Sequence, residues 1–139
     1  MAGTTLEAVH LNGRRSRPLV LLIEDNLTQL DLYGVVLQEE LNITTATRGE
    51  TGFTIATIEQ PAAIVVDVLL PDGDGLALCD RLRQHPKTAG TPLIVLTGDD
   101  HAYERAMRTR TVDAVLKKPC PAERLLTTLH CAIAARSVR

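Results

Sequence analysis

Five short apolar runs alternate with stretches of helical character along this chain, and the alternation strongly limits the folds available to it. The runs cover residues 19–24, 43–46, 63–67, 93–97 and 112–116. Several are apolar nearly throughout, as expected of strands that are covered on both faces. Strands that alternate with helices through short loops favour a parallel sheet flanked by helices on both sides. We therefore predict an α/β fold, and the length of 139 residues favours a single domain.

Capping and helix-breaking residues between these runs indicate where the helices begin and end. Asn26 is a candidate N-cap, and the helix after it carries apolar residues at helical spacing as far as Leu41. Pro61 and the pair His85-Pro86 interrupt the second and third helices. The second, fourth and fifth helices are predicted over about residues 50–58, over 101–108 and from Pro121 onward. One helix is thus expected after each strand.

The composition argues against several classes of function. The net charge is −2 and aromatic residues make up 2% with no Trp, so the chain offers neither a basic field nor a stacking platform for nucleic acid. Three cysteines without CxxC spacing favour reduced thiols in a cytosolic protein. No run approaches the ~20 apolar residues of a membrane span, and the run that follows the basic segment 14–17 ends on Glu24 without a cleavage site. We expect a cytoplasmic protein without direct membrane or nucleic-acid binding.

Polar residues stand at the predicted carboxyl ends of four strands. They are Glu24 and Asp25 at the end of the first strand, Asp67 at the end of the third, Thr97 at the end of the fourth and Lys118 just after the fifth. Right-handed crossovers place these ends along one edge of the sheet, where parallel α/β folds bind ligands. A single Asp or Thr at such a position is more often a helix cap. The whole set on neighbouring strands indicates a binding site instead.

The charges of this set indicate which chemistry the site supports. Two carboxylates about 4 Å apart repel each other by roughly 4 kcal/mol at an effective dielectric of ~20. A hard divalent cation with oxygen ligands relieves this repulsion, and Mg²⁺ shares its shell with phosphate groups. Lys118 adds a positive charge and Thr97 a hydroxyl. These are the groups needed for phosphoryl transfer to a carboxylate, in which the protein mainly positions groups and neutralises charge.

Four motifs together resemble the response-regulator receiver domain of two-component signalling, the CheY-like superfamily. They are "LLIEDN" from Leu21, "VVDVLLPDGDGL" from Val65, "VLTG" from Val95 and "KKP" from Lys117. Each motif is weak alone, but the set is specific, and the resemblance covers about Pro18 to the end. It implies a flavodoxin-like, doubly wound (βα)5 sandwich with strand order 2-1-3-4-5. The receiver domain would span residues 18–139, after a flexible extension over 1–17.

The resemblance implies a role for each residue at this edge. Asp67 would be the phosphoacceptor, with a phosphorylated histidine of a sensor kinase or of a histidine phosphotransfer protein as donor. Glu24, Asp25, Asp67 and the backbone carbonyl of Leu69 would bind Mg²⁺. Lys118, ahead of a cis peptide at Pro119, would contact the phosphoryl oxygens. The protein would then be no enzyme beyond its own phosphoryl transfer and dephosphorylation.

The same resemblance implies a switch. Thr97 would move to hydrogen-bond the phosphoryl group, and Gly98 would leave space for that group. The change would reach the face built by the fourth helix, fifth strand and fifth helix, which would bind a downstream protein target or a second copy of the chain. The family usually has Tyr or Phe three residues before the lysine, but this chain has Val115. That part of the relay is therefore missing or rebuilt.

Three other interpretations can be weighed from the sequence. An EF-hand loop counted from Asp72 would need Glu at its twelfth position, where Arg83 stands, so calcium is rejected. A phosphatase of the haloacid dehalogenase type needs a second Asp two residues after the first, where Leu69 stands. A degenerate receiver, acting as a phosphorylation-independent interaction module, is the alternative that stays open. The chain is either a stand-alone regulator or an excised receiver.

Overall fold

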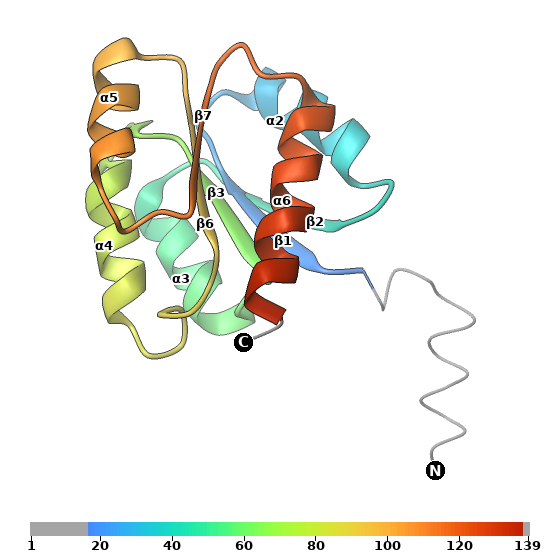
Figure 1. The fold of residues 1–139 in the computed structure, drawn as a ribbon, viewed down its shortest axis with the longest axis horizontal. Helices are drawn as coiled ribbons and strands as arrows, with labels where there is room; N and C mark the ends of the chain where they lie inside the picture. The colour runs from blue at the N-terminus through green and yellow to red at the C-terminus, as the bar shows by residue number, and fades with distance from the viewer. Residues whose placement is uncertain (1–16, 138–139) are drawn as a thin grey trace.

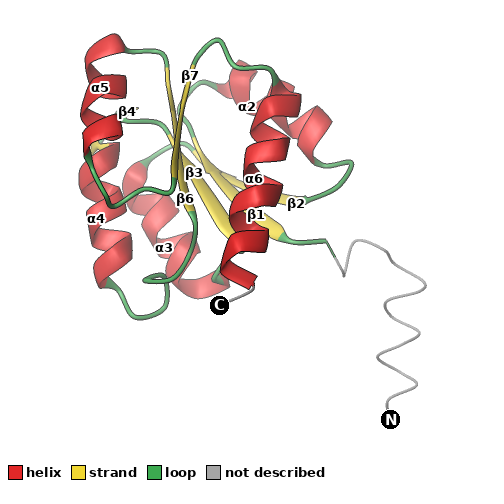
Figure 2. Ribbon diagram, viewed as in Figure 1, coloured by secondary structure: helices red, strands yellow, loops and turns green. Residues whose placement is uncertain are grey.

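The computed structural model describes residues 17–137, which form a three-layer α/β arrangement (Figure 1). The main sheet contains β1 (Leu19–Ile23), β2 (Asn42–Ala46), β3 (Ala63–Val66), β6 (Leu93–Thr97) and β7 (Ala114–Lys117). The helices are α2 (Leu27–Leu37), α3 (Gly49–Glu59), α4 (Gly75–Gln84), α5 (Asp100–Arg108) and α6 (Ala122–Ser137). Figure 2 shows strands and helices in alternation, as predicted. Within 17–137, no helix has both the length and the hydropathy that a bilayer span requires.

The five strands of the main sheet are parallel and lie in the order β2-β1-β3-β6-β7. This is the predicted order 2-1-3-4-5, because β6 and β7 are the fourth and fifth strands of this sheet. The order reverses at β1, so the carboxyl ends of β1 and β3 meet where the two halves of the sheet diverge. In sheets of this type that place is the usual ligand site.

Each face of the sheet carries its own hydrophobic core. Because side chains alternate across a strand, Leu21 and Ile23 of β1 pack on one face, and Val20 and Leu22 pack on the other. The first face is covered by α3, α4 and α5, and the second by α2 and α6 (Figure 1). This double covering explains why the strands read as continuous apolar runs.

Some predicted boundaries were wrong. The fifth strand begins at Ala114 and not at Val112, because Val112 packs against the core from the preceding loop without joining the ladder. The first helix ends at Leu37. Leu41 is buried beyond it, with its N–H bonded to the Leu37 carbonyl at 2.9 Å. A short antiparallel hairpin of β4 (Leu69–Leu70) and β5 (Gly73–Asp74) was not predicted.

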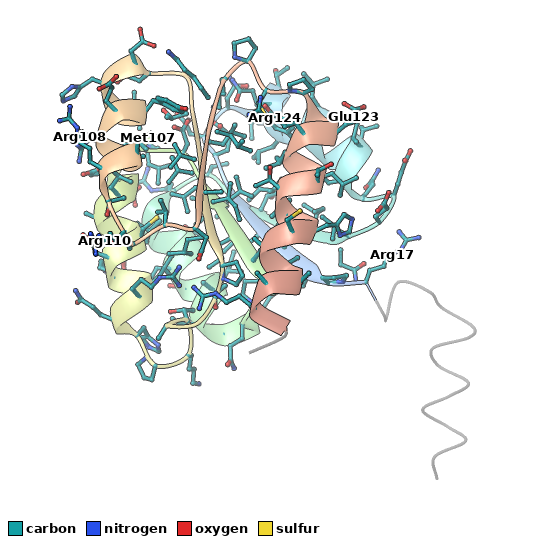
Figure 3. All side chains as sticks on the ribbon, viewed as in Figure 1. Arg17, Met107, Arg108, Arg110, Glu123 and Arg124 are labelled. Atoms are coloured by element: carbon teal, nitrogen blue, oxygen red, sulfur yellow. The ribbon has the colours of Figure 1, made fainter. Side chains whose placement is uncertain are left out.

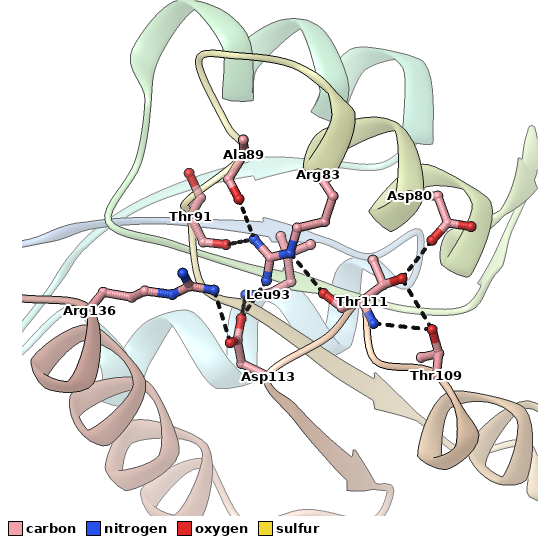
Figure 4. A network of polar contacts seen from close by, with 9 residues as sticks. All are labelled: Asp80, Arg83, Ala89, Thr91, Leu93, Thr109, Thr111, Asp113 and Arg136. Atoms are coloured by element: carbon pink, nitrogen blue, oxygen red, sulfur yellow. Dashed lines mark hydrogen bonds and ion pairs between the residues drawn. The ribbon is translucent and has the colours of Figure 1, made fainter. Parts of the chain in front are cut away.

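An arginine–aspartate network closes the amino ends of β6 and β7, at the edge opposite the acidic residues (Figure 4). Arg83 of α4 donates to the carbonyls of Ala89, Thr91 and Thr111, and to the Asp113 carboxylate at 2.7 Å. Asp113 also accepts from the Leu93 N–H at 2.8 Å and from Arg136 of α6 at 3.1 Å. The network therefore ties α4, β6, β7 and α6 together.

Candidate functional site

Glu24 and Asp67 lie side by side at the carboxyl edge of the sheet. They follow Ile23 and Val66, which are paired in the β1–β3 ladder. The Asp67 N–H donates to the Ile23 carbonyl at 3.1 Å, so this register continues past the end of the strands. Both side chains are nearly buried, with Glu24 7% and Asp67 9% exposed. Asp25 is exposed, and one carboxylate oxygen from each of the three residues lies within 4.8 Å of the others.

Lys118 brings a positive charge to these carboxylates. Its ammonium lies 2.5 Å from Glu24 Oε1 and 3.2 Å from Asp67 Oδ2. The Lys118 N–H donates to the Thr97 carbonyl at 2.9 Å, which fixes the loop after β7 against the end of β6. The Lys118–Pro119 peptide is cis, as predicted. Lys117 is not part of this cluster: its ammonium pairs with Asp100 at the surface.

The site holds more negative than positive charge. Burial raises the pKa of Glu24, although hydrogen bonds from Lys118 and from the Asn26 N–H oppose this change. Burial alone would lower the pKa of Lys118, but the hydrogen bond to Glu24 and the charge of Asp67 outweigh it and raise the pKa. Three carboxylates share one ammonium, which leaves two negative charges in excess when all four groups are ionised.

The donor set fits a hard divalent cation. Asp67 Oδ1 accepts the Leu69 N–H at 3.2 Å and Oδ2 accepts Lys118, so each oxygen keeps a second lone pair. Glu24 likewise uses one oxygen for Lys118 and the other for the Asn26 N–H. Carboxylate oxygens are the ligands that Mg²⁺ prefers, and the uncompensated charge equals that of one such ion. The acidic cluster could therefore hold the metal that the sequence predicts.

Thr97 and Gly98 lie beside Lys118, at the end of β6. Thr97 is fully buried, and its Oγ1 accepts the Asp99 N–H at 3.3 Å. A Cβ added at Gly98 would lie 3.5 Å from Lys118 Cβ, which is an ordinary contact. This conformation by itself does not require glycine at position 98.

Val115 lies on β7, half-buried against the core. It lines a groove of about 330 Å³ beside α5, together with Ala106, Met107 and Val112. The groove lies at the position where receiver domains usually carry Tyr or Phe and this chain carries Val115. The fourth helix, fifth strand and fifth helix of the sequence correspond to α5, β7 and α6.

Two residues of the site were missed by sequence reasoning. Asp72, in the β4–β5 turn, accepts the Gly49 N–H at 2.7 Å and the Glu50 N–H at 3.0 Å, and so caps α3 from 23 residues away. These hydrogen bonds hold the pKa of Asp72 below its usual value. A Cβ at Gly75 would lie 2.2 Å from the Asp67 carbonyl oxygen, so only glycine fits there.

The loop after Asp67 is also linked to α4 and α5. Asp74 caps α4 by accepting the Leu76 N–H at 3.1 Å, and its other oxygen accepts Arg105 of α5 at 2.6 Å. The backbone around Asp67 is therefore held by three helices. In the sequence, the glycine that follows the Asp72–Asp74 turn was the one indication that the loop packs closely against the backbone of Asp67.

Dimerisation through the α5–β7–α6 face could use arginines that form ion pairs with a second copy of the chain. Arginines already paired within their own chain are less available for this. Arg105 and Arg136 pair with carboxylates of their own chain, and Arg108 pairs with Glu104 one helical turn away. Arg110 and Arg124 are exposed at the surface (Figure 3). Dimerisation through this face stays a prediction.

A doubly covered parallel sheet with acidic groups and a lysine at its carboxyl edge defines the class of α/β proteins that bind ligands at a strand-order reversal. The sequence profile of the response regulator receiver domain matches residues 20–130. The chain therefore belongs to the receiver domain family of two-component response regulators.

Two regulators and one solved structure show how similar the relatives are. The DNA-binding dual master transcriptional regulator RpaA of Synechocystis sp. is 30% identical over 81% of this chain and 48% of its own length. The transcriptional regulatory protein AfsQ1 of Streptomyces coelicolor is 37% identical over 72% of this chain and 44% of its own. The chain thus spans less than half of either regulator.

The solved structure is the signal receiver domain of a signal transduction histidine kinase from Syntrophus aciditrophicus. It superposes with a TM-score of 0.76 and 26% identity, covering 85% of this chain and 91% of that one. The flavodoxin-like fold predicted from the sequence is confirmed.

Proposed function

We propose that Asp67 accepts a phosphoryl group from a phosphohistidine of a sensor kinase or phosphotransfer protein. One carboxylate oxygen of Asp67 attacks phosphorus, the P–N bond to the histidine breaks, and the imidazole leaves with the electron pair and takes up a proton. The observation that carries this proposal is the Lys118 ammonium, which lies within reach of both Glu24 and Asp67.

Each residue at the edge has a part in this transfer. Glu24, Asp25, Asp67 and the Leu69 carbonyl would hold Mg²⁺, which supplies charge neutralisation for the phosphoryl oxygens. Lys118, whose ammonium already lies 3.2 Å from Asp67 Oδ2, would neutralise a further phosphoryl oxygen. Fixed charges of this kind stabilise a transition state without reorganisation.

Phosphorylation would then change the α5–β7–α6 face. The Thr97 hydroxyl would leave the Asp99 N–H, to which it is now bonded at 3.3 Å, and donate to a phosphoryl oxygen. Gly98 would follow, and α5 begins two residues later. Because Val115 has no ring to rotate, the change would reach the groove beside α5 through this backbone movement. A downstream protein target would bind the altered face.

Incubation with acetyl phosphate and Mg²⁺ tests the proposal. Intact-mass measurement should show one added phosphoryl group that hydroxylamine removes, and the Asp67→Asn variant should gain none. A chain that gains no group while remaining folded would instead be a phosphorylation-independent interaction module. Continuous release of phosphate without a stable adduct would indicate a phosphatase.

A further inference from the structure

The Tyr33 hydroxyl joins α2 to the loop that carries Lys118. It donates to the Cys120 carbonyl at 3.0 Å, between residues 87 positions apart in the sequence. Tyr33 lies on the same face of α2 as the buried Leu30 and Leu37 and packs against the core cluster that also contacts Cys120. Packing therefore fixes the ring and directs the hydroxyl toward the loop.

The loop over residues 118–121 has few backbone donors with which to hold itself. Pro119 and Pro121 lack an N–H. The Lys118 N–H is bonded to the Thr97 carbonyl at one end, and the Pro121 carbonyl accepts N–H groups from the start of α6 at the other. Between these anchors, the Cys120 carbonyl is held by Tyr33. The placement of the Lys118 side chain depends on this short segment.

The hydroxyl also lies within electrostatic range of the acidic site. Burial is the main cause of the raised pKa of Tyr33, and the charges of Lys118 and Glu24 act on that pKa in opposite directions. Its hydrogen bond nevertheless goes to the loop and not to a carboxylate. Tyr33 is thus placed to act on the site through the backbone that bears Lys118.

We propose that Tyr33 is a positioning residue for Lys118: its hydrogen bond to Cys120 holds the loop so that the ammonium stays between Glu24 and Asp67. The effect on phosphoryl transfer rests on the function proposed above. The effect on the placement of Lys118 does not, so the two can be tested separately.

The placement is tested by reductive methylation of the native protein. Peptide mass spectrometry then gives the modification rates of Lys118 and of the exposed Lys87. Tyr33→Phe should raise the rate at Lys118 about fivefold, the factor typical of one hydrogen bond, and leave Lys87 unchanged. Tyr103→Phe, which removes a hydroxyl elsewhere, should change neither. Equal protection of Lys118 in wild type and Tyr33→Phe would overturn the proposal.

The catalytic consequence is tested by a double-mutant cycle with acetyl phosphate and Mg²⁺. Tyr33→Phe should slow phosphorylation about fivefold, and should have no further effect in a Lys118→Met background. An equal loss in both backgrounds would overturn the role through Lys118, because a general structural defect acts regardless of the lysine. A wild-type chain that gains no phosphoryl group would overturn the proposed function, while the methylation rates would still decide the placement.

Discussion

The Lys118 ammonium lies 2.5 Å from Glu24 Oε1, although the two residues are 94 positions apart in the sequence. Its distance to Asp67 Oδ2 is longer, at 3.2 Å. Lys118 is therefore held mainly by Glu24 in this conformation. A cation bound at Glu24 would compete with the ammonium for that oxygen.

Lys118→Met should lower the rate of phosphorylation by acetyl phosphate at least about tenfold, because the fixed positive charge beside Asp67 is lost. Mg²⁺ should raise the melting temperature of this variant more than that of the wild type, since Glu24 and Asp67 then lack their ammonium. Calorimetry with and without the metal measures this. Lys117→Met is the matched control and should behave as wild type; an unchanged rate in Lys118→Met would contradict the assignment.

Gly75→Ala should destabilise the fold by about 1 to 3 kcal/mol, the usual cost of overpacking. The added Cβ would lie 2.2 Å from the Asp67 carbonyl oxygen and 2.8 Å from Val68 Cα, and backbone atoms yield little. Urea unfolding measures the change. Gly34→Ala, where a Cβ meets nothing within 4 Å, should instead stabilise α2 by about 1 kcal/mol.

Asp72 should contribute stability that is lost in acid. The pKa of Asp72 in the folded protein is below the ordinary value of an Asp carboxyl, because two N–H groups of α3 bond the ionised carboxylate. The contribution is fully present above the ordinary Asp pKa of the unfolded chain and disappears as pH falls through the lower folded pKa. Urea unfolding from pH 6 to pH 2 should therefore show a smaller decline for Asp72→Asn than for wild type. Asp31→Asn, which removes an exposed carboxylate on α2, is the control for the loss of one charge.

Arg83→Met should lower stability by about 2 to 3 kcal/mol, because the Asp113 carboxylate and three carbonyls lose a charged donor. Arg108→Met removes an exposed pair one helical turn apart and should cost less than about 0.5 kcal/mol. Equal losses in both variants would mean that the network contributes no more than a surface ion pair.

Thr97→Ala should still take up a phosphoryl group, at up to about tenfold lower rate, but should not transmit the change to α5, since the hydroxyl that reaches the phosphoryl oxygen is gone. Amide NMR shifts along α5 and β7, measured before and after phosphorylation, report this. Thr97→Ser retains the hydroxyl and serves as the control. Full shifts in Thr97→Ala would show that the switch uses another group.

The sequence predicted the layers and the acidic edge because both follow from local patterns. Runs such as 63–67 are apolar on both faces, which indicates a doubly covered sheet. A parallel sheet then aligns the residues that follow each strand, so Glu24, Asp67 and Lys118 had to converge. Their separations and the preference of Lys118 for Glu24 depend on side-chain conformations that spacing does not encode.

Contacts between distant segments were not predictable in this way. The side chain of Arg48, at the cap position of α3, makes no capping hydrogen bond. Asp72 takes that role from a hairpin that the sequence did not indicate. Val112 was predicted to lie in the fifth strand because it is apolar, but it packs against the core from the loop before β7. Nothing in the sequence indicated that Arg83 would be surrounded by acceptors from the loops before β6 and β7, because the residues that supply them lie 8 to 30 positions away in the chain.

The network around Asp113 has a mechanical consequence. Arg136 lies in the last turn of α6 and shares Asp113 with Arg83 of α4. A tag or partner domain fused behind α6 would pull first on these two guanidinium groups. Force applied to the end of α6 would be shared between α4 and the beginnings of β6 and β7, at the edge of the sheet opposite Asp67. Fusions at this end should therefore leave the chemistry of Asp67 unchanged.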